Sequence, residues 1–127
     1  MFEQDYIMRL IKELVRTLLK LLFHIDMESP TDELLENMEE KYVLENLLEL
    51  VDAGKINEAE NQLIEMLSGG DRNKLEMALL FYAYLNEKTD EFLQENHFSR
   101  KEIKEGIEAA AARHGITNVS EIFLEDM

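Results

Sequence analysis

Residues 75–85 read Leu-Glu-Met-Ala-Leu-Leu-Phe-Tyr-Ala-Tyr-Leu, and at 100° per residue their apolar side chains point in nearly every direction around a helix. A helix of this kind is normally buried on several sides, because it has no broad polar arc to present to water. We therefore predict that this helix lies at the centre of the fold. Asp71 is placed to cap its start.

Apolar residues recur at three- and four-residue spacing along almost all of the remaining chain. No stretch shows the alternation of apolar and polar residues, bounded by turn residues, that is typical of a strand. These patterns predict an all-α fold of antiparallel helical hairpins, an array of about five to six helices. We expect one domain over 1–127, and its predicted parts are an amphipathic N-terminal helix (3–25), a hairpin (30–70), a second, degenerate hairpin (71–115) and a C-terminal tail (116–127).

The first predicted helix has a wide apolar face opposite a basic stripe. The apolar face is also a candidate self-association face, and it comprises Ile7, Ile11, Leu14, Leu18 and Leu22, with Leu10, Val15 and Leu21 beside them. The basic stripe consists of Arg9, Lys12, Arg16 and Lys20.

Three interpretations of this helix remain open on the sequence alone. In the first, the apolar face packs on the rest of the domain. In the second, this face forms the seam of a homodimer with Ile7 and Leu14 at the two-fold axis. In the third, the helix lies on a membrane surface. Three acidic residues reduce the net charge of residues 1–25 to +1, which disfavours the membrane interpretation. Charged residues interrupt the apolar run, so a membrane-spanning helix is excluded.

The next two helices are predicted from start and stop residues. Ser29 and Pro30 suit the first turn of a helix that runs to about Asp52. Its expected buried positions are Leu35, Met38, Tyr42, Leu44, Leu47, Leu48 and Val51. Asn57 and Glu60 have capping-box spacing for a third helix, which we expect to bury Ala59, Leu63, Met66 and Leu67 and to end at Gly69-Gly70.

The hairpin resembles a tetratricopeptide repeat over residues 40–73, on the segments Asp52-Ala53-Gly54-Lys55 and Asn57-Glu58-Ala59-Glu60. The resemblance implies that Gly54 turns the chain and that Ala59 lets two helices approach closely. It puts Leu47, Leu50 and Leu63 at the packing positions. The usual terminal proline is absent, and a second copy from Lys74 departs at Asn96 and Ser99. A generic antiparallel helix pair is the alternative.

Three shorter elements follow. A short helix is predicted around Asp90 to Gln94, and Ser99 with Glu102 forms a capping box for a longer helix that Gly115 ends. That helix carries Ile103, Ile107, Ala110 and Ala111. A last turn or two is expected over Asn118 to Leu124.

The opening Met-Phe-Glu-Gln-Asp-Tyr-Ile-Met-Arg-Leu-Ile-Lys-Glu of residues 1–13, with Leu-Lys-Leu-Leu-Phe at 19–23, resembles a family of uncharacterised proteins from clostridia-type Gram-positive bacteria. The similarity continues through the hairpin. It implies a small helical bacterial protein. It implies no catalytic residue, ligand or partner.

The chain is strongly acidic, with 28 acidic and 13 basic residues among 127 and a formal charge of −15. Residues 26–70 hold 13 acidic and two basic residues, a net charge of −11. Phosphate repels such a chain, so we expect no nucleic-acid binding. The acidic hairpin favours a basic protein partner.

No arrangement of residues in the sequence indicates a catalytic, metal-binding or cofactor-binding site. His24, His97 and His114 fall at the ends of three predicted helices without ligand spacing, and cysteine is absent. The zinc, calcium, di-iron, phosphate-loop and nucleophile-elbow motifs are also absent. We therefore expect no enzyme, no metal site and no cofactor.

The sequence favours a cytoplasmic bacterial module for protein–protein interaction, built on a helical repeat. The absence of cysteine and of a secretory signal fits a cytoplasmic location. A peripheral membrane factor that uses the first helix is the alternative. An acidic inhibitor of a basic protein is the weaker one.

Overall fold

The computed structural model describes residues 2–24, 38–69 and 72–116, and all regular structure in them is helical. The helices are α1 (Phe2–Phe23), α2 (Met38–Asp52), α3 (Ile56–Leu67), α4 (Arg72–Asn86), α5 (Asp90–Glu95) and α6 (Arg100–Arg113). This confirms the predicted all-α array. The expected caps at Ser29 and Asp71, the stop at Gly70 and the last turn over 118–124 lie outside the described residues.

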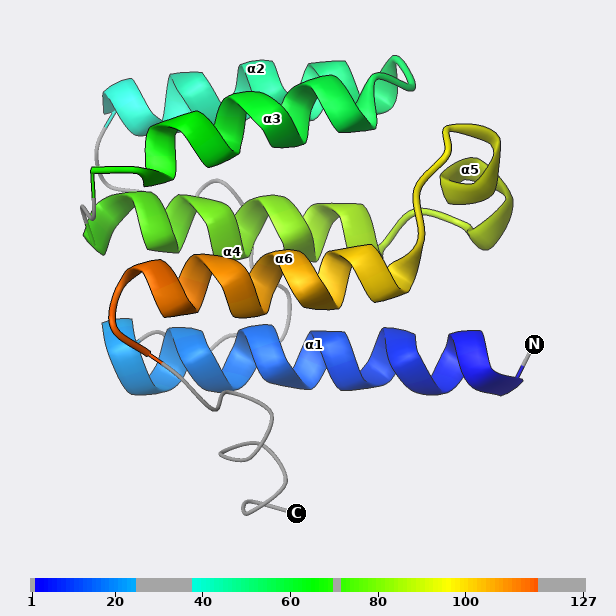
Figure 1. Ribbon diagram of the computed structural model, residues 1–127, viewed down its shortest axis with the longest axis horizontal. Coiled ribbons are helices and arrows are strands. Elements are labelled where there is room, and N and C mark those ends of the chain that lie inside the picture. Colours follow the sequence, from blue (N-terminus) through cyan, green and yellow to red (C-terminus); the bar gives the residue numbers. More distant parts are fainter. Residues whose placement is uncertain (1, 25–37, 70–71, 117–127) are drawn as a thin grey trace.

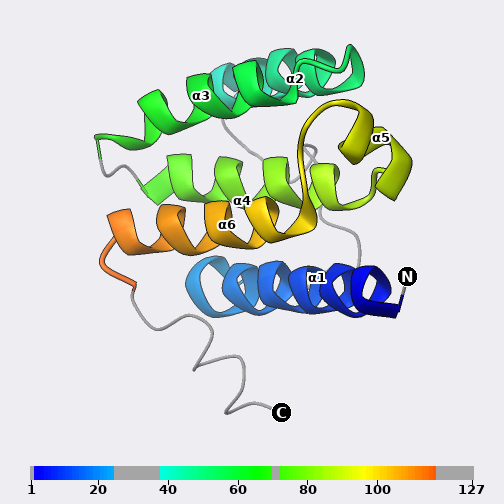
Figure 2. The same cartoon turned by 45° about the vertical axis from the view of Figure 1, so that its right-hand side comes forward.

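Helix α4 lies at the centre, as its all-round apolarity predicts. The α2–α3 hairpin packs on one side of α4, and α1 and α6 pack on the other (Figure 1). Helix α4 runs antiparallel to both α1 and α6 (Figures 1 and 2). Its buried residues are Leu75, Met77, Ala78, Leu79, Leu80, Phe81, Tyr82, Leu85 and Asn86.

Helix α1 packs its apolar face on α4 and α6. Its buried residues are Ile11, Leu14, Val15, Leu18 and Leu19. Leu21 was expected on the same face, but its side chain is 57% exposed. At 100° per residue Leu21 lies about 80° from Ile11, toward the margin of the buried face.

A Schellman turn joins α2 to α3. Gly54 has a φ of +84° and its N–H donates to the Val51 carbonyl at 2.9 Å, while the Lys55 N–H donates to the Leu50 carbonyl at 2.8 Å. A Cβ on Gly54 would lie 2.5 Å from Asn96 Oδ1, so the turn also packs on the segment after α5. Glycine is therefore required here by its backbone conformation and by its neighbour.

The capping box expected at Asn57 and Glu60 is wrong. The Schellman turn leads directly into α3, so Lys55 occupies the N-cap position and no side chain caps the helix. Asn57 is already in the first turn, and its Nδ2 donates to the His97 carbonyl at 3.5 Å. Glu60 instead accepts a hydrogen bond from Tyr82 at 2.8 Å.

The predicted N-cap at Ser99 is confirmed, but the Glu102 carboxylate bonds to the Ser99 hydroxyl and not to the backbone N–H that completes a capping box. Ser99 Oγ accepts from the Glu102 N–H at 3.2 Å and donates to the Glu102 carboxylate at 3.1 Å. Thr89 caps the short helix α5 by accepting from the Phe92 N–H at 3.1 Å.

Arg100, the first residue of α6, is buried and closes the carboxyl end of α4. Its Nη1 donates to the Asn86 carbonyl at 2.8 Å, and its Nη2 donates to the Lys88 carbonyl at 2.7 Å. Its Nε donates to Asp90 at 3.0 Å, and Asn86 Nδ2 donates to the Met8 carbonyl of α1 at 2.8 Å. This network joins α1, α4, α5 and α6.

We expect Arg100→Lys to destabilise the protein by on the order of 3 kcal/mol, because an ammonium group cannot reach three diverging acceptors and leaves buried carbonyls unpaired. Urea denaturation measures the loss. The exposed neighbour variant Lys101→Arg is the control and should unfold like the parent. Equal unfolding midpoints for Arg100→Lys and the parent would contradict this role.

Gly106 permits close packing of α6 on the buried Tyr82 ring, because a Cβ at this position would overlap the ring. Replacing a helical glycine by alanine ordinarily stabilises a helix by about 1 kcal/mol. Here we expect Gly106→Ala to lower the free energy of unfolding by roughly 1–3 kcal/mol, since overpacking outweighs helix propensity. Thermal denaturation measures whether Gly106→Ala lowers or raises the stability. A higher melting temperature would show that the Tyr82 ring moves aside freely.

Candidate functional site

The histidines lie where the sequence placed them, at helix ends. His24 follows α1 and His97 follows α5, each with a φ of +59°. His114 caps α6, and its Nδ1 lies 2.9 Å from the Ala110 carbonyl oxygen. Among the residues that the structure describes, no three His, Asp or Glu side chains gather into a group that could hold a metal ion.

The residues predicted to pack the hairpin occupy its inner side. Leu47, Ala59 and Leu63 are buried, and Leu50 is partly buried against the same core. Gly54 forms the turn between the helices. Helices α2 and α3 pack on each other and on α4.

The structure divides the candidate self-association face. Ile11, Leu14 and Leu18 lie in the core of the chain itself, whereas Ile7 and Leu22 are partly buried at its margin. The basic stripe lies on the opposite side of α1, with Arg9, Lys12 and Lys20 exposed and Arg16 half-buried. Arg16 also pairs with Glu13 at 3.7 Å.

Tyr42 is the main departure from the predicted core. It was expected to be buried, but its side chain is 66% exposed on the outer face of α2. The sequence spacing already indicates this exposure. Leu44, Leu47 and Val51 define the buried face, and Tyr42 lies about 200° around the helix from Leu44. Glu39, Glu45 and Glu49 are exposed around Tyr42 on this outer α2 face.

Two other carboxylates of α2 are paired with lysines of the α4 segment. Glu40 is buried and lies 3.7 Å from Lys74. Asp52 accepts from Lys88 at 2.6 Å and from the Tyr84 hydroxyl at 2.7 Å. The Lys88 ammonium also lies 4.8 Å from the centre of the Tyr84 ring and 5.2 Å from that of Phe92.

The carboxylates of the outer α2 face differ from these two. In residues 2–24, 38–69 and 72–116, no cation lies within ion-pair distance of Glu39, Glu45 or Glu49. Within the described residues, Glu40 and Asp52 are therefore paired with lysines, whereas the carboxylates around Tyr42 have no cation beside them. The outer α2 face is the candidate functional surface.

Two carboxylates that accept hydrogen bonds from tyrosines, Asp52 and Glu60, have pKa values shifted in opposite directions. Partial burial raises the pKa of Asp52, but the hydrogen bonds from Lys88 and Tyr84 outweigh it, so the pKa lies below its ordinary value. Burial raises the pKa of Glu60 above its ordinary value, the hydrogen bond from Tyr82 opposes this, and the charge of Glu102 adds to it.

The described helices form an all-α domain. A family model described as "Family of unknown function (DUF6483)" matches residues 1–115, and the chain belongs to this family. This agrees with the resemblance of the first 13 residues to an uncharacterised family. No curated protein and no solved structure matched the chain.

None of the described helices is both long enough and apolar enough to span a bilayer.

The two carboxylates should respond to pH in opposite directions. Asp52 has a lowered pKa in the folded state, so its stabilisation is present at neutral pH and disappears as the pH falls through that pKa. Glu60 has a raised pKa, so its contribution is present at acidic pH and disappears as the pH rises through that pKa.

We therefore expect Asp52→Asn to destabilise the protein at pH 7, with a deficit that shrinks in acid. Glu60→Gln should cause no loss at pH 7, because its amide oxygen still accepts the Tyr82 hydroxyl. Urea denaturation of parent and variants between about pH 3.5 and 7.5 measures both effects. Shifts of the same sign for both variants would contradict the assignment.

Proposed function

We propose that the protein is a non-enzymatic protein–protein interaction module and that the outer α2 face binds a basic segment of its partner. The observation that supports this is Tyr42, which is 66% exposed among Glu39, Glu45 and Glu49. An exposed aromatic ring with uncompensated carboxylates around it suits arginine or lysine better than any other side chain.

The chemistry of the partner follows from these groups. A guanidinium can lie on the face of the Tyr42 ring and still pair with a neighbouring carboxylate. Tyrosine is also among the residues that contribute most to binding at interfaces. The surrounding glutamates would speed association and select for a basic segment.

The proposal extends to the hairpin that presents this surface. We propose that α2 and α3 are a tetratricopeptide-like pair, supported by the glycine turn at Gly54 and by the fully buried Ala59 between helices. The inner side of the hairpin stabilises the fold, and the outer side of α2 faces the partner.

The membrane alternative is less well supported. Ile11, Leu14 and Leu18, which a membrane-surface helix would insert into the bilayer, are buried against α4 and α6. An inhibitor of a basic protein would use the same outer α2 face, so it is a special case of the proposal. A cytoplasmic location is also proposed, since the chain has no cysteine.

The test compares two charge reversals of equal size. Immobilised parent, a Glu45→Lys/Glu49→Lys variant and a Glu58→Lys/Glu65→Lys control capture proteins from the native cell. The control changes two exposed glutamates of α3, so net charge changes equally in both variants.

We expect the parent and the α3 control to retain the same protein and the α2 variant to lose it. Purified partner, titrated against Tyr42→Ala by calorimetry, should bind at least tenfold more weakly than to the parent, a change of about 1.4 kcal/mol. Retention by both charge variants, or unchanged affinity of Tyr42→Ala, would refute the surface.

A further inference from the structure

One flank of α1 carries two strongly exposed apolar side chains, Tyr6 and Leu21. Tyr6 is 58% exposed and Leu21 is 57% exposed, and together with Tyr42 they are the exposed large apolar side chains of the described residues. At 100° per residue Tyr6, Leu10, Thr17 and Leu21 lie within about 60° of arc. They form a stripe about 22 Å long, the α1 flank.

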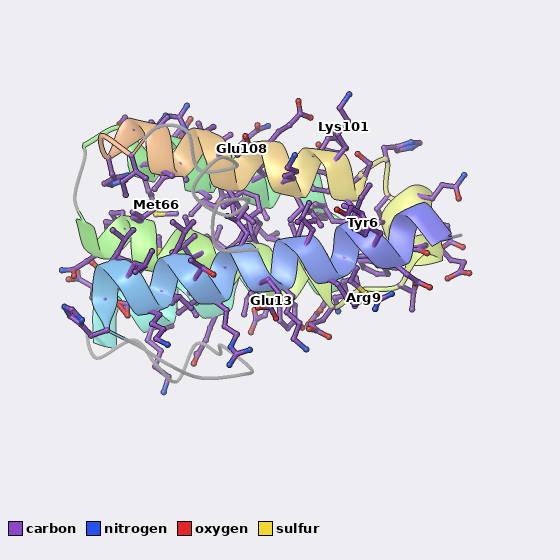
Figure 3. All side chains as sticks on the ribbon, turned by 90° about the horizontal axis from the view of Figure 1, so that it is seen from below. Tyr6, Arg9, Glu13, Met66, Lys101 and Glu108 are labelled. Carbon is purple, nitrogen blue, oxygen red and sulfur yellow. The ribbon has the colours of Figure 1, made fainter. Side chains whose placement is uncertain are left out.

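The α1 flank is distinct from both the core face and the basic stripe. Figure 3 looks directly onto α1 and shows Tyr6 on the edge next to α6, with Arg9 on the other edge. Glu13, seven residues after Tyr6, lies about 20° from it around the helix and borders the flank. Leu10 is partly buried at the margin of the core, and Leu14 lies inside it. The flank therefore starts where the cover provided by α6 ends.

The distribution of charge along the chain favours a second copy of the same protein as the partner of the α1 flank. Residues 1–25 have a net charge of +1, whereas residues 26–70, 71–95 and 96–127 have net charges of −11, −3 and −2. Two copies of a chain with a charge of −15 repel each other over most of their surfaces. Helix α1 and the neighbouring helix α6 each carry a net charge of +1, so two copies repel each other least along this side of the molecule.

The spacing of the flank makes it complementary to itself. Its four residues are separated by 4, 7 and 4 positions, a pattern that is the same in either direction. If two α1 helices pack antiparallel about a two-fold axis between positions 13 and 14, Tyr6 meets Leu21 of the second copy. Leu10 then meets Thr17 of that copy, and the same patch is used twice.

We propose that the α1 flank is the seam of an antiparallel homodimer. This moves the two-fold seam from Leu14, which is buried in the chain, to Tyr6 and Leu21. One pair of helices over about 22 Å covers less than the roughly 1,200–2,000 Å² of a standard stable interface. The dimer is therefore a concentration-dependent one. It does not depend on the outer α2 face, which lies on a different helix.

The first test is sedimentation equilibrium of the full chain from about 5 to about 500 µM, a range that brackets a weak dimer. The parent should pass from monomer to dimer, and Leu21→Glu should weaken dimerisation at least tenfold. Tyr42→Glu is the matched control, since it puts the same charge on a similarly exposed apolar residue of α2. It should dimerise like the parent.

Circular dichroism checks that both variants stay folded, as expected for exposed positions. A parent that remains monomeric over the whole range overturns the proposal. A Leu21→Glu variant that dimerises like the parent overturns it as well.

The second test fixes the direction of the two helices. The chain has no cysteine, so Tyr6→Cys and Leu21→Cys each introduce a single thiol. Under mild oxidation a mixture of the two variants should give mainly the mixed disulfide dimer. Each variant alone should cross-link slowly, because its two thiols lie about 22 Å apart, far beyond disulfide reach. Faster cross-linking of either variant with itself overturns the antiparallel seam.

Discussion

The burial of α4 on nearly every side is the constraint to which the other helices conform. A helix enclosed by four others cannot leave its last carbonyl groups to water, and unpaired buried carbonyls are costly. Arg100 meets this requirement from the first turn of α6, with its guanidinium on the carbonyls of Asn86 and Lys88. Asn86 in turn holds the backbone of α1 at Met8. One cation thus fixes the positions of three helices and complements the dipole of the central one.

The same arrangement divides the carboxylates of this acidic chain into those near α4 and those on the outer side of α2. Carboxylates that approach the centre find a partner on the α4 segment, as Glu40 does with Lys74, Asp52 with Lys88 and Glu60 with the Tyr82 hydroxyl. A buried or half-buried carboxylate requires a cation or a hydrogen-bond donor, since desolvation without one is unfavourable. Carboxylates on the outer side of α2 remain solvated and need no partner for folding. Their excess is therefore available for binding, which is why we assign function to that face.

The two surfaces that we propose for binding belong to α2 and α1, which lie on opposite sides of α4 (Figure 1). The outer α2 face combines Tyr42 with negative charge, and the α1 flank combines Tyr6 and Leu21 with a local net charge near neutrality. Because the two surfaces differ in charge, they suit different partners. A dimer formed through α1 would present two outer α2 faces, so a partner with two basic segments would gain avidity from it.

Local signals were sufficient for much of this fold. Helix periodicity, the Gly54 turn, the Ser99 N-cap and the central position of α4 all follow from residues close together in the chain. Periodicity states which residues share a helix face, but it does not state how wide an arc the neighbouring helices cover. Tyr42 is exposed for that reason, and Leu21 is exposed at the margin of the buried face of α1. Arg100 is buried because it contacts the end of α4, and Asn57 does not cap α3 but contacts the turn after α5. Both contacts join segments that are distant in the sequence, and no local pattern predicts them.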